Sequence, residues 1–152
     1  MKNTNIELIP VKSELDIATF AKLKTEMIHY HKQFADSSNI KDTETLKYTE
    51  EDSISHLNDE NYFLFLIKFN KKVVGILEYK NSISDIKDES IVYVNSIYIL
   101  EEYQGNQIGK NIIEYLKERF GTVELKAYYN LPAKDFYKHL GFKEVYSKLV
   151  LE

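Results

Sequence analysis

The residues from Ile97 to Lys110 have the pattern of a strand that runs into a glycine-bearing loop and then opens a helix. A helix start exposes unpaired N–H groups and the positive end of the helix dipole, which suits an anion such as a phosphate. Gly105 and Gly109 let the backbone come close to a bulky ligand, and Lys110 adds positive charge. A plain strand-to-helix turn gives the same pattern, so this segment alone leaves both interpretations open.

A second motif lies near the C-terminus, where Asn130 to Phe142 reads N-L-P-A-K-D-F-Y-K-H-L-G-F. The first motif reads Q-G-N-Q-I-G from Gln104 to Gly109 and follows Ile97-Tyr98-Ile99. In this order, with one helix and one strand between them, the two segments resemble the acyl-CoA loop and the C-terminal motif of the GNAT superfamily of N-acetyltransferases. The resemblance is strong from Ile91 to Val145, and earlier it rests only on the order of elements.

The resemblance implies a set of residues that bind acetyl-CoA. The family's loop wraps the pyrophosphate with backbone N–H groups, and its strand pairs exposed backbone with the pantetheine arm. A strand N–H can also hold the thioester oxygen as negative charge develops on it. Asn130 would bond the cofactor arm or, alternatively, cap the following helix. The expected cofactor-binding residues are Ile97, Tyr98, Ile99, Gln104, Gly105, Asn106, Gln107, Ile108, Gly109, Lys110, Asn130 and Tyr137.

Gln107 departs from the family pattern, because it stands where the family has the first glycine of the loop. In the family this is the position at which the backbone comes nearest to the pyrophosphate. We expect a helical φ at Gln107, which tolerates a side chain, so that binding survives if the side chain points outward.

Tyr137 resembles the family's general acid, which protonates the departing CoA thiolate. A phenol with a pKa near ~10 is suited to donate to a thiolate of similar basicity. The alternative is a surface tyrosine on an amphipathic helix, in a chain that contains 12 tyrosines.

No motif identifies the general base. An amine with a pKa near ~10 is mostly protonated at neutral pH, so a proton must be removed before the amine attacks. Strand alternation places Tyr93, Asn95, Ile97 and Ile99 on one face. Tyr93 and Asn95 stand where family members often have a histidine or glutamate, and each could hold a water that relays the proton. Glu78, expected at the end of the preceding strand, is the carboxylate candidate, and a solvated strand end is the alternative.

The histidines do not suggest a metal site. His29 and His31 lie two residues apart on an expected helix and face different ways, while His56 and His139 are isolated in the sequence. The chain has no cysteine, which excludes disulfides and thiolate metal sites. We therefore expect no metal cofactor.

Charge and hydropathy limit the partners. The net charge is −4 and the only arginine is Arg119, so no basic face for nucleic acid is expected. No apolar run approaches the roughly 18 residues that suggest a membrane span. The N-terminal residues lack the apolar stretch of a secretory signal. These features predict a cytoplasmic protein, monomeric or homodimeric, without membrane or nucleic-acid partners.

The hydrophobic pattern predicts the elements that must position these residues. Ser13 with Asp16 and Thr49 with Asp52 have the spacing of capping boxes, the second opening a helix that covers Ile54 and Leu57. The expected strands are Ile6–Val11, Tyr62–Phe69, Lys72–Tyr79, Ile91–Leu100, Thr122–Tyr128 and Phe142–Leu151, with later helices over Ile108–Phe120 and Leu131–Leu140. The order β-α-α-β-β-β-α-β-α-β predicts one α/β domain over residues 1–152, with a GNAT-like mixed, mostly antiparallel central sheet flanked by helices.

The implied reaction is direct attack of a primary amine, on a small molecule or peptide, on the acetyl thioester within a ternary complex. The segment from Ala35 to Lys47 is expected to shape the acceptor site, so a polyamine, an antibiotic, an amino acid and a protein N-terminus all stay open. Two other classes also stay open. One is a non-catalytic acyl-CoA sensor, favoured by Gln107 and the missing base. The other is a Rossmann-type nucleotide-binding domain, which requires a G-x-G-x-x-G loop after the first strand of an all-parallel sheet.

Overall fold

The computed structural model describes residues 1–34, 47–128 and 130–151. In these residues the strands form a five-stranded sheet in the order β1-β2-β3-β4-β5. The first four strands pair antiparallel and β5 pairs parallel with β4. The elements are β1 (Ile6–Pro10), α1 (Glu14–Lys32), α2 (Glu50–Leu57), β2 (Tyr62–Phe69), β3 (Lys72–Ile83), β4 (Ser90–Ile99), the 3-10 turn η1 (Glu101–Tyr103), α3 (Ile108–Phe120), β5 (Val123–Leu125) and α4 (Ala133–His139).

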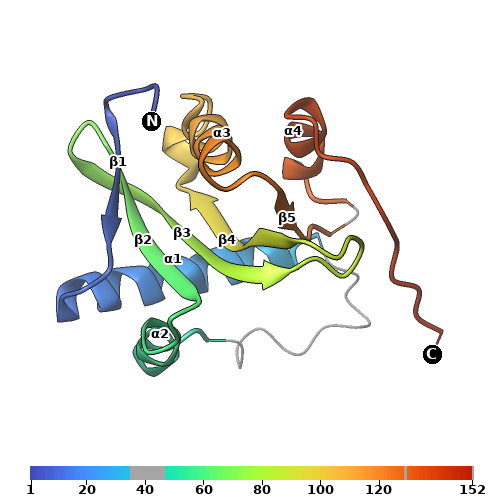
Figure 1. Cartoon of the computed structure of the whole chain (residues 1–152). Helices are drawn as coiled ribbons and strands as arrows, with labels where there is room; N and C mark the ends of the chain where they lie inside the picture. The colour runs from blue at the N-terminus through green and yellow to red at the C-terminus, as the bar shows by residue number, and fades with distance from the viewer. Residues whose placement is uncertain (35–46, 129, 152) are drawn as a thin grey trace.

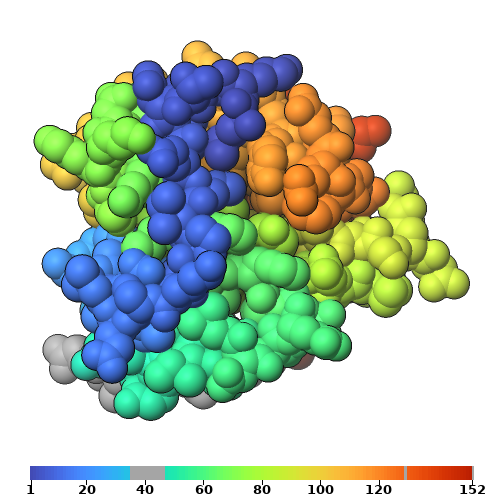
Figure 2. Space-filling model, turned by 60° about the vertical axis from the view of Figure 1, so that its left-hand side comes forward, coloured from blue at the N-terminus to red at the C-terminus, as the bar shows by residue number. Residues whose placement is uncertain are grey.

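The helices cover both faces of the sheet, with α1 and α2 on one face and α3 and α4 on the other (Figure 1). Each face has its own buried apolar cluster. The cluster under α1 contains Phe20, Leu23, Leu64, Leu66 and Ile76, and the cluster under α3 contains Val74, Leu77, Ile112, Ile113 and Leu116. Figure 2 shows the β1 edge of the sheet, in dark blue, beside α3, in orange, with α2, in teal, at the bottom of the view.

Local sequence signals explain the starts of α1 and α2. Both predicted capping boxes are present, because the Ser13 and Thr49 side chains accept hydrogen bonds from the backbone N–H groups of Asp16 and Asp52, and both carboxylates bond back. The predicted turn at Asn70-Lys71 is also confirmed. Both residues have positive φ, 49° and 70°, as tight antiparallel hairpins require.

The predicted order of elements is confirmed from β1 to α4, and the antiparallel pairing of β1 to β4 rules out an all-parallel Rossmann sheet. Three strand predictions were wrong. Strand β3 continues past Tyr79 to Ile83, because its last residues pair with the start of β4. Strand β5 is shorter than expected. The expected closing strand over Phe142–Leu151 does not form, and Leu149 is 91% exposed. Strand propensity alone does not provide a neighbouring strand to pair with.

None of the helices in the described ranges is long and apolar enough to cross a membrane.

Candidate active site

Strand β4 loses its β5 partner halfway along. The β4–β5 pairing ends at Val94 and Leu125. The β3–β4 register changes at the same place, because Tyr79 pairs with Val94 and Glu78 pairs with Ser96. Asn95 is thus the extra residue of a β-bulge. Beyond the bulge, the described residues place no strand against the β5 side of Ile97–Ile99, so that backbone edge is available to a ligand except at the Ile99 carbonyl, which accepts a hydrogen bond from Gln104.

The bulge also separates side chains that were predicted to share one face. Ile97 and Ile99 pack against the cluster under α3. Asn95 instead donates a hydrogen bond to Glu78, whose other partners come from α1 and α2. The expectation of a single face was wrong because one inserted residue reverses the alternation of every residue after it.

The loop after β4 is held by side-chain bonds to its own backbone. Gln104 Nε2 donates to the carbonyl of Ile99 at 3.0 Å, and Asn106 Nδ2 donates to the carbonyl of Tyr103 at 2.9 Å. Gly105 has a φ of 87°, a conformation that glycine adopts without strain. The loop therefore leaves the end of β4 in a fixed direction and is exposed from Gln104 to Gln107.

Gln107 has left-handed backbone angles, φ 59° and ψ 20°, so the expectation of a right-handed helical φ was wrong. It is the N-cap of α3, and its side chain makes no capping bond. A left-handed residue followed by helical ones forms a concave nest of backbone N–H groups that suits an anion. The first turn of α3 also lacks acidic residues, while Lys110 is exposed. These left-handed angles explain why the family pattern has glycine at the position of Gln107, because a residue with a Cβ is strained there by about 1 kcal/mol or more.

The C-terminal motif packs against this helix start. A Cβ added to Gly109 would lie 3.3 Å from the ring of Phe136, so the ring rests where the glycine leaves room. Tyr137 is half-buried, with its ring centroid 5.6 Å from that of Phe142. Burial raises the pKa of Tyr137 to about 12, which keeps the phenol protonated at neutral pH. The structure therefore brings the two motifs together on the α3 side of the sheet.

Asn130 is exposed and does not cap α4. The N-cap of α4 is Pro132, and no side chain makes a capping bond there. The helix-cap interpretation of Asn130 was therefore wrong, and its side chain stays available for another role.

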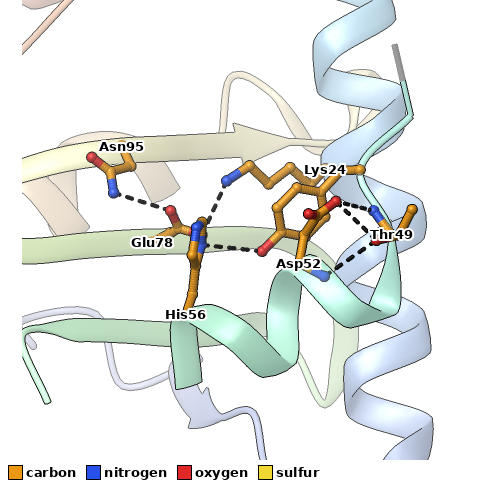
Figure 3. Close-up of polar contacts among 7 residues, drawn as sticks. Lys24, Thr49, Asp52, His56, Glu78 and Asn95 are labelled. Carbon is orange, nitrogen blue, oxygen red and sulfur yellow. Dashed lines mark hydrogen bonds and ion pairs between the residues drawn. The ribbon is translucent and has the colours of Figure 1, made fainter. Parts of the chain in front are cut away.

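Glu78 lies in the middle of β3 with no exposed surface, so neither the predicted strand end nor the solvated alternative holds. Its Oε1 accepts a hydrogen bond from Asn95 Nδ2 at 3.0 Å. Its Oε2 lies 3.0 Å from Lys24 Nζ and 3.3 Å from His56 Nδ1. These four side chains, which we call the Glu78 cluster, come from α1, α2, β3 and β4 and meet on the α1 side of the sheet (Figure 3).

Sequence reasoning missed His56, which it treated as isolated. The imidazole contacts Glu78 and also lies 3.3 Å from the Tyr48 hydroxyl. Its ring stacks on Tyr62 with 4.6 Å between centroids. Helix α2 turns Ser53 inward, leaves Ile54 exposed and brings His56 and Leu57 against the protein. The spacing of Ser53, His56 and Leu57 is that of one helix face, which is the signal that could have found this histidine.

Tyr93 is linked to the Glu78 cluster through a lysine amine, which lies over its ring and over the Tyr62 ring that stacks on His56. Lys80 Nζ sits 5.5 Å from the Tyr93 ring centroid and 5.6 Å from that of Tyr62. Burial raises the pKa of Tyr93, so its hydroxyl is not a base at neutral pH.

An open cavity of about 480 Å³ lies beside the end of β4, lined by Tyr98, Leu100, Glu101 and Glu102. The charges of Glu26 and Glu101 add to burial in raising the pKa of Tyr98. The surroundings are therefore acidic and favour a cationic ligand. A second cavity, of about 270 Å³ between the N-terminus and α3, is lined by none of the candidate residues.

Within the described residues, no group of three or more histidine, cysteine, aspartate or glutamate side chains is arranged to hold a metal ion.

Comparison with known proteins supports the class that the fold and the two motifs define. The profile of the acetyltransferase (GNAT) family matches residues 26–142. The chain therefore belongs to the GNAT family of acetyltransferases. No curated protein matches the chain significantly.

Solved structures show the same fold at low identity. A possible acetyltransferase from Clostridium difficile 630 is 20% identical, with 97% of this chain and 96% of that chain covered and a TM-score of 0.69. A ribosomal-protein-alanine N-acetyltransferase from Brucella melitensis biovar Abortus 2308 is 17% identical, with coverages of 97% and 96% and a TM-score of 0.65. A predicted acetyltransferase with acetyl-CoA from Clostridium acetobutylicum is 14% identical, with coverages of 97% and 96% and a TM-score of 0.66.

Proposed function

We propose that this chain, acting as one domain, is an acetyl-CoA-dependent N-acetyltransferase that moves an acetyl group to a primary amine. The observation that carries the proposal is the opening of the sheet after Val94 and Leu125. This opening leaves a strand edge between the start of α3, whose backbone N–H groups suit an anion, and the Glu78 cluster on the other face.

The residues on the α3 side fit acetyl-CoA, which would supply an acetyl group activated as a thioester. The nest at Gln107 and the first-turn N–H groups of α3 suit the diphosphate, and no acidic side chain in that turn opposes it. The free edge of Ile97–Ile99 offers backbone groups to the pantetheine amides, as a sheet edge accepts an added peptide. The exposed Asn130 side chain is available to the same arm.

The acceptor amine is expected on the α1 side, near Asn95 and Tyr93. Acidic side chains around Tyr98, further along β4 on the same side of the sheet, favour a cation beside that residue. A primary amine of a small molecule or a peptide fits this charge. The segment predicted to shape the acceptor site, Ala35 to Lys47, lies outside the described residues except for Lys47.

The transfer forms a bond between the amine nitrogen and the carbonyl carbon and breaks the bond between that carbon and sulfur. Tyr137 would give its proton to the departing thiolate and regain one from solvent. An ammonium acceptor loses two protons overall. One ends on the CoA thiol and the other is released, which requires a base on the acceptor side.

Thermal shift measurements with acetyl-CoA, free CoA, ATP and NAD side by side test the cofactor. We expect stabilisation by acetyl-CoA and CoA and none by ATP or NAD. CoA release with a panel of primary amines then tests the reaction. Stabilisation without CoA release from any amine would favour a non-catalytic acyl-CoA sensor, and no stabilisation by acetyl-CoA would refute both.

A further inference from the structure

His56 presents one ring nitrogen to a buried carboxylate, and no described residue hydrogen-bonds the other. From this arrangement we infer that His56 is the general base of the acetyl transfer and that Glu78 is the residue that positions it. The inference rests on the proposed function and assigns the base that the sequence did not reveal.

Glu78 itself is unsuited to meet an amine. It has no exposed surface, and both of its carboxylate oxygens already have partners in Lys24, His56 and Asn95. An acceptor nitrogen could reach it only by displacing one of these. The His56 side chain is 31% exposed and is therefore the member of the pair that a ligand can touch.

The contacts of His56 bear on its tautomer. Its Nδ1 lies 3.3 Å from both Glu78 Oε2 and the Tyr48 hydroxyl oxygen. Because a carboxylate only accepts hydrogen bonds, the contact with Glu78 requires the hydrogen on Nδ1 in the neutral ring, and the Tyr48 hydroxyl can accept from the same N–H. The lone pair is then on Nε2, which makes no hydrogen bond in the described part of the chain. Stacking on Tyr62 limits rotation of the ring. A base held in one tautomer by a buried carboxylate is the arrangement that favours proton abstraction.

The charges around His56 support the same role. On α1, Lys24 balances the charge of Glu78, and on α2 the Asp52 carboxylate is close enough for its own pKa to be lowered by His56, after its stronger bonds to Thr49. Tyr48 and Tyr62 are further titratable groups in contact with the ring. An imidazolium formed by proton transfer would therefore lie beside carboxylates, which stabilise it.

The Glu78 cluster also connects the base to the place where the thioester is expected. The carboxylate that bonds His56 through Oε2 bonds Asn95 through Oε1, and Asn95 is the bulge residue at which β4 becomes free of β5. During attack, His56 Nε2 would take the proton that the amine nitrogen loses and return it to solvent. Tyr137, on the other face, would serve the thiolate. The two proton transfers thus use separate residues.

The test compares native protein with His56→Gln, Glu78→Gln and the control His29→Gln, which changes an exposed histidine on α1. The rates of CoA release are measured between about pH 5 and pH 9 with an amine that the native protein acetylates. We expect His56→Gln to lower kcat by about 100- to 10,000-fold and to abolish the acid limb of the kcat/KM profile. Binding of acetyl-CoA and the melting temperature are followed in every variant.

Further measurements separate a catalytic from a structural role. In His56→Ala, added imidazole should restore part of kcat, which a purely structural histidine would not allow. Glu78→Gln should lower kcat and displace the acid limb without changing acetyl-CoA affinity. The variant that combines His56→Gln with Glu78→Gln should have a kcat little lower than that of His56→Gln alone. His29→Gln should match the native protein.

Three results would overturn the inference. One is a His56→Gln protein that keeps the native kcat and acid limb. The second is a folded His56→Ala protein that imidazole does not rescue. The third is a native protein that binds acetyl-CoA but acetylates no amine, which would remove the proposed function together with its base. If the native protein and His56→Gln are equally active, the assignment of His56 as the base is refuted and the proposed function stands.

Discussion

Replacing Lys24 with methionine should destabilise the protein, because it leaves the Glu78 carboxylate buried without its cation. Lys24 Nζ lies 3.0 Å from Glu78 Oε2, and the two side chains are 12% and 1% exposed. At an effective dielectric constant of about 20, charges at this distance attract by on the order of 5 kcal/mol, most of which offsets their removal from water. Breaking such a pair from one side typically costs about 3–5 kcal/mol.

Lys24→Met should lower the free energy of unfolding by about 3 kcal/mol, the lower end of that range, because His56 and Asn95 still bond Glu78. A loss of this size lowers the melting temperature by roughly 6–12 °C in a chain of this length.

Urea unfolding of four proteins measures the effect: native, Lys24→Met, Glu78→Gln and the variant that combines both changes. If the pair is coupled, the double variant should lose about 3 kcal/mol, not the sum of the single losses. Lys71→Met is the matched control. Lys71 pairs with Glu7 at 2.9 Å, but its side chain is 86% exposed, so its removal should change little. Additive losses, or an equal loss in the control, would refute the reasoning.

Tyr137→Phe should lower kcat by about 100- to 10,000-fold while acetyl-CoA affinity stays near native, and the exposed Tyr146→Phe should have no effect. Since the pKa of Tyr137 is raised to about 12 and the acid form is the active one, native activity should not fall through its ionisation until the pH approaches that value. Unchanged turnover in Tyr137→Phe would remove it as the acid. Gln107→Gly should leave the free energy of unfolding within about 1 kcal/mol of native and keep acetyl-CoA affinity, whereas Gln107→Val should cost about 1–3 kcal/mol. Equal stability of the two, measured in urea, would argue against the left-handed backbone. Gly75→Ala should cost about 3 kcal/mol or more, because the new Cβ would lie 2.1 Å from the carbonyl oxygen of Tyr98. A native melting temperature in that variant would contradict the close β3–β4 approach.

Features set by neighbouring residues were determined by the sequence. The capping boxes at Ser13 and Thr49, the turn at Asn70-Lys71 and the helix from Ile108 to Phe120 each depend on contacts within a few residues. The two motifs were also sufficient to indicate the family, because their residues and order stand in the chain itself.

Tertiary pairing decided the features on which the proposed chemistry depends. The bulge at Asn95 exists only in the register between β3 and β4, and it alone determines which side chains of β4 face Glu78. His56 precedes Glu78 by 22 residues, and no local pattern states that α2 packs this ring against the carboxylate. The left-handed angle at Gln107 likewise follows from the path between β4 and α3. Local propensity and spacing act along the chain, whereas burial, register and charge pairing arise only when distant segments share one sheet.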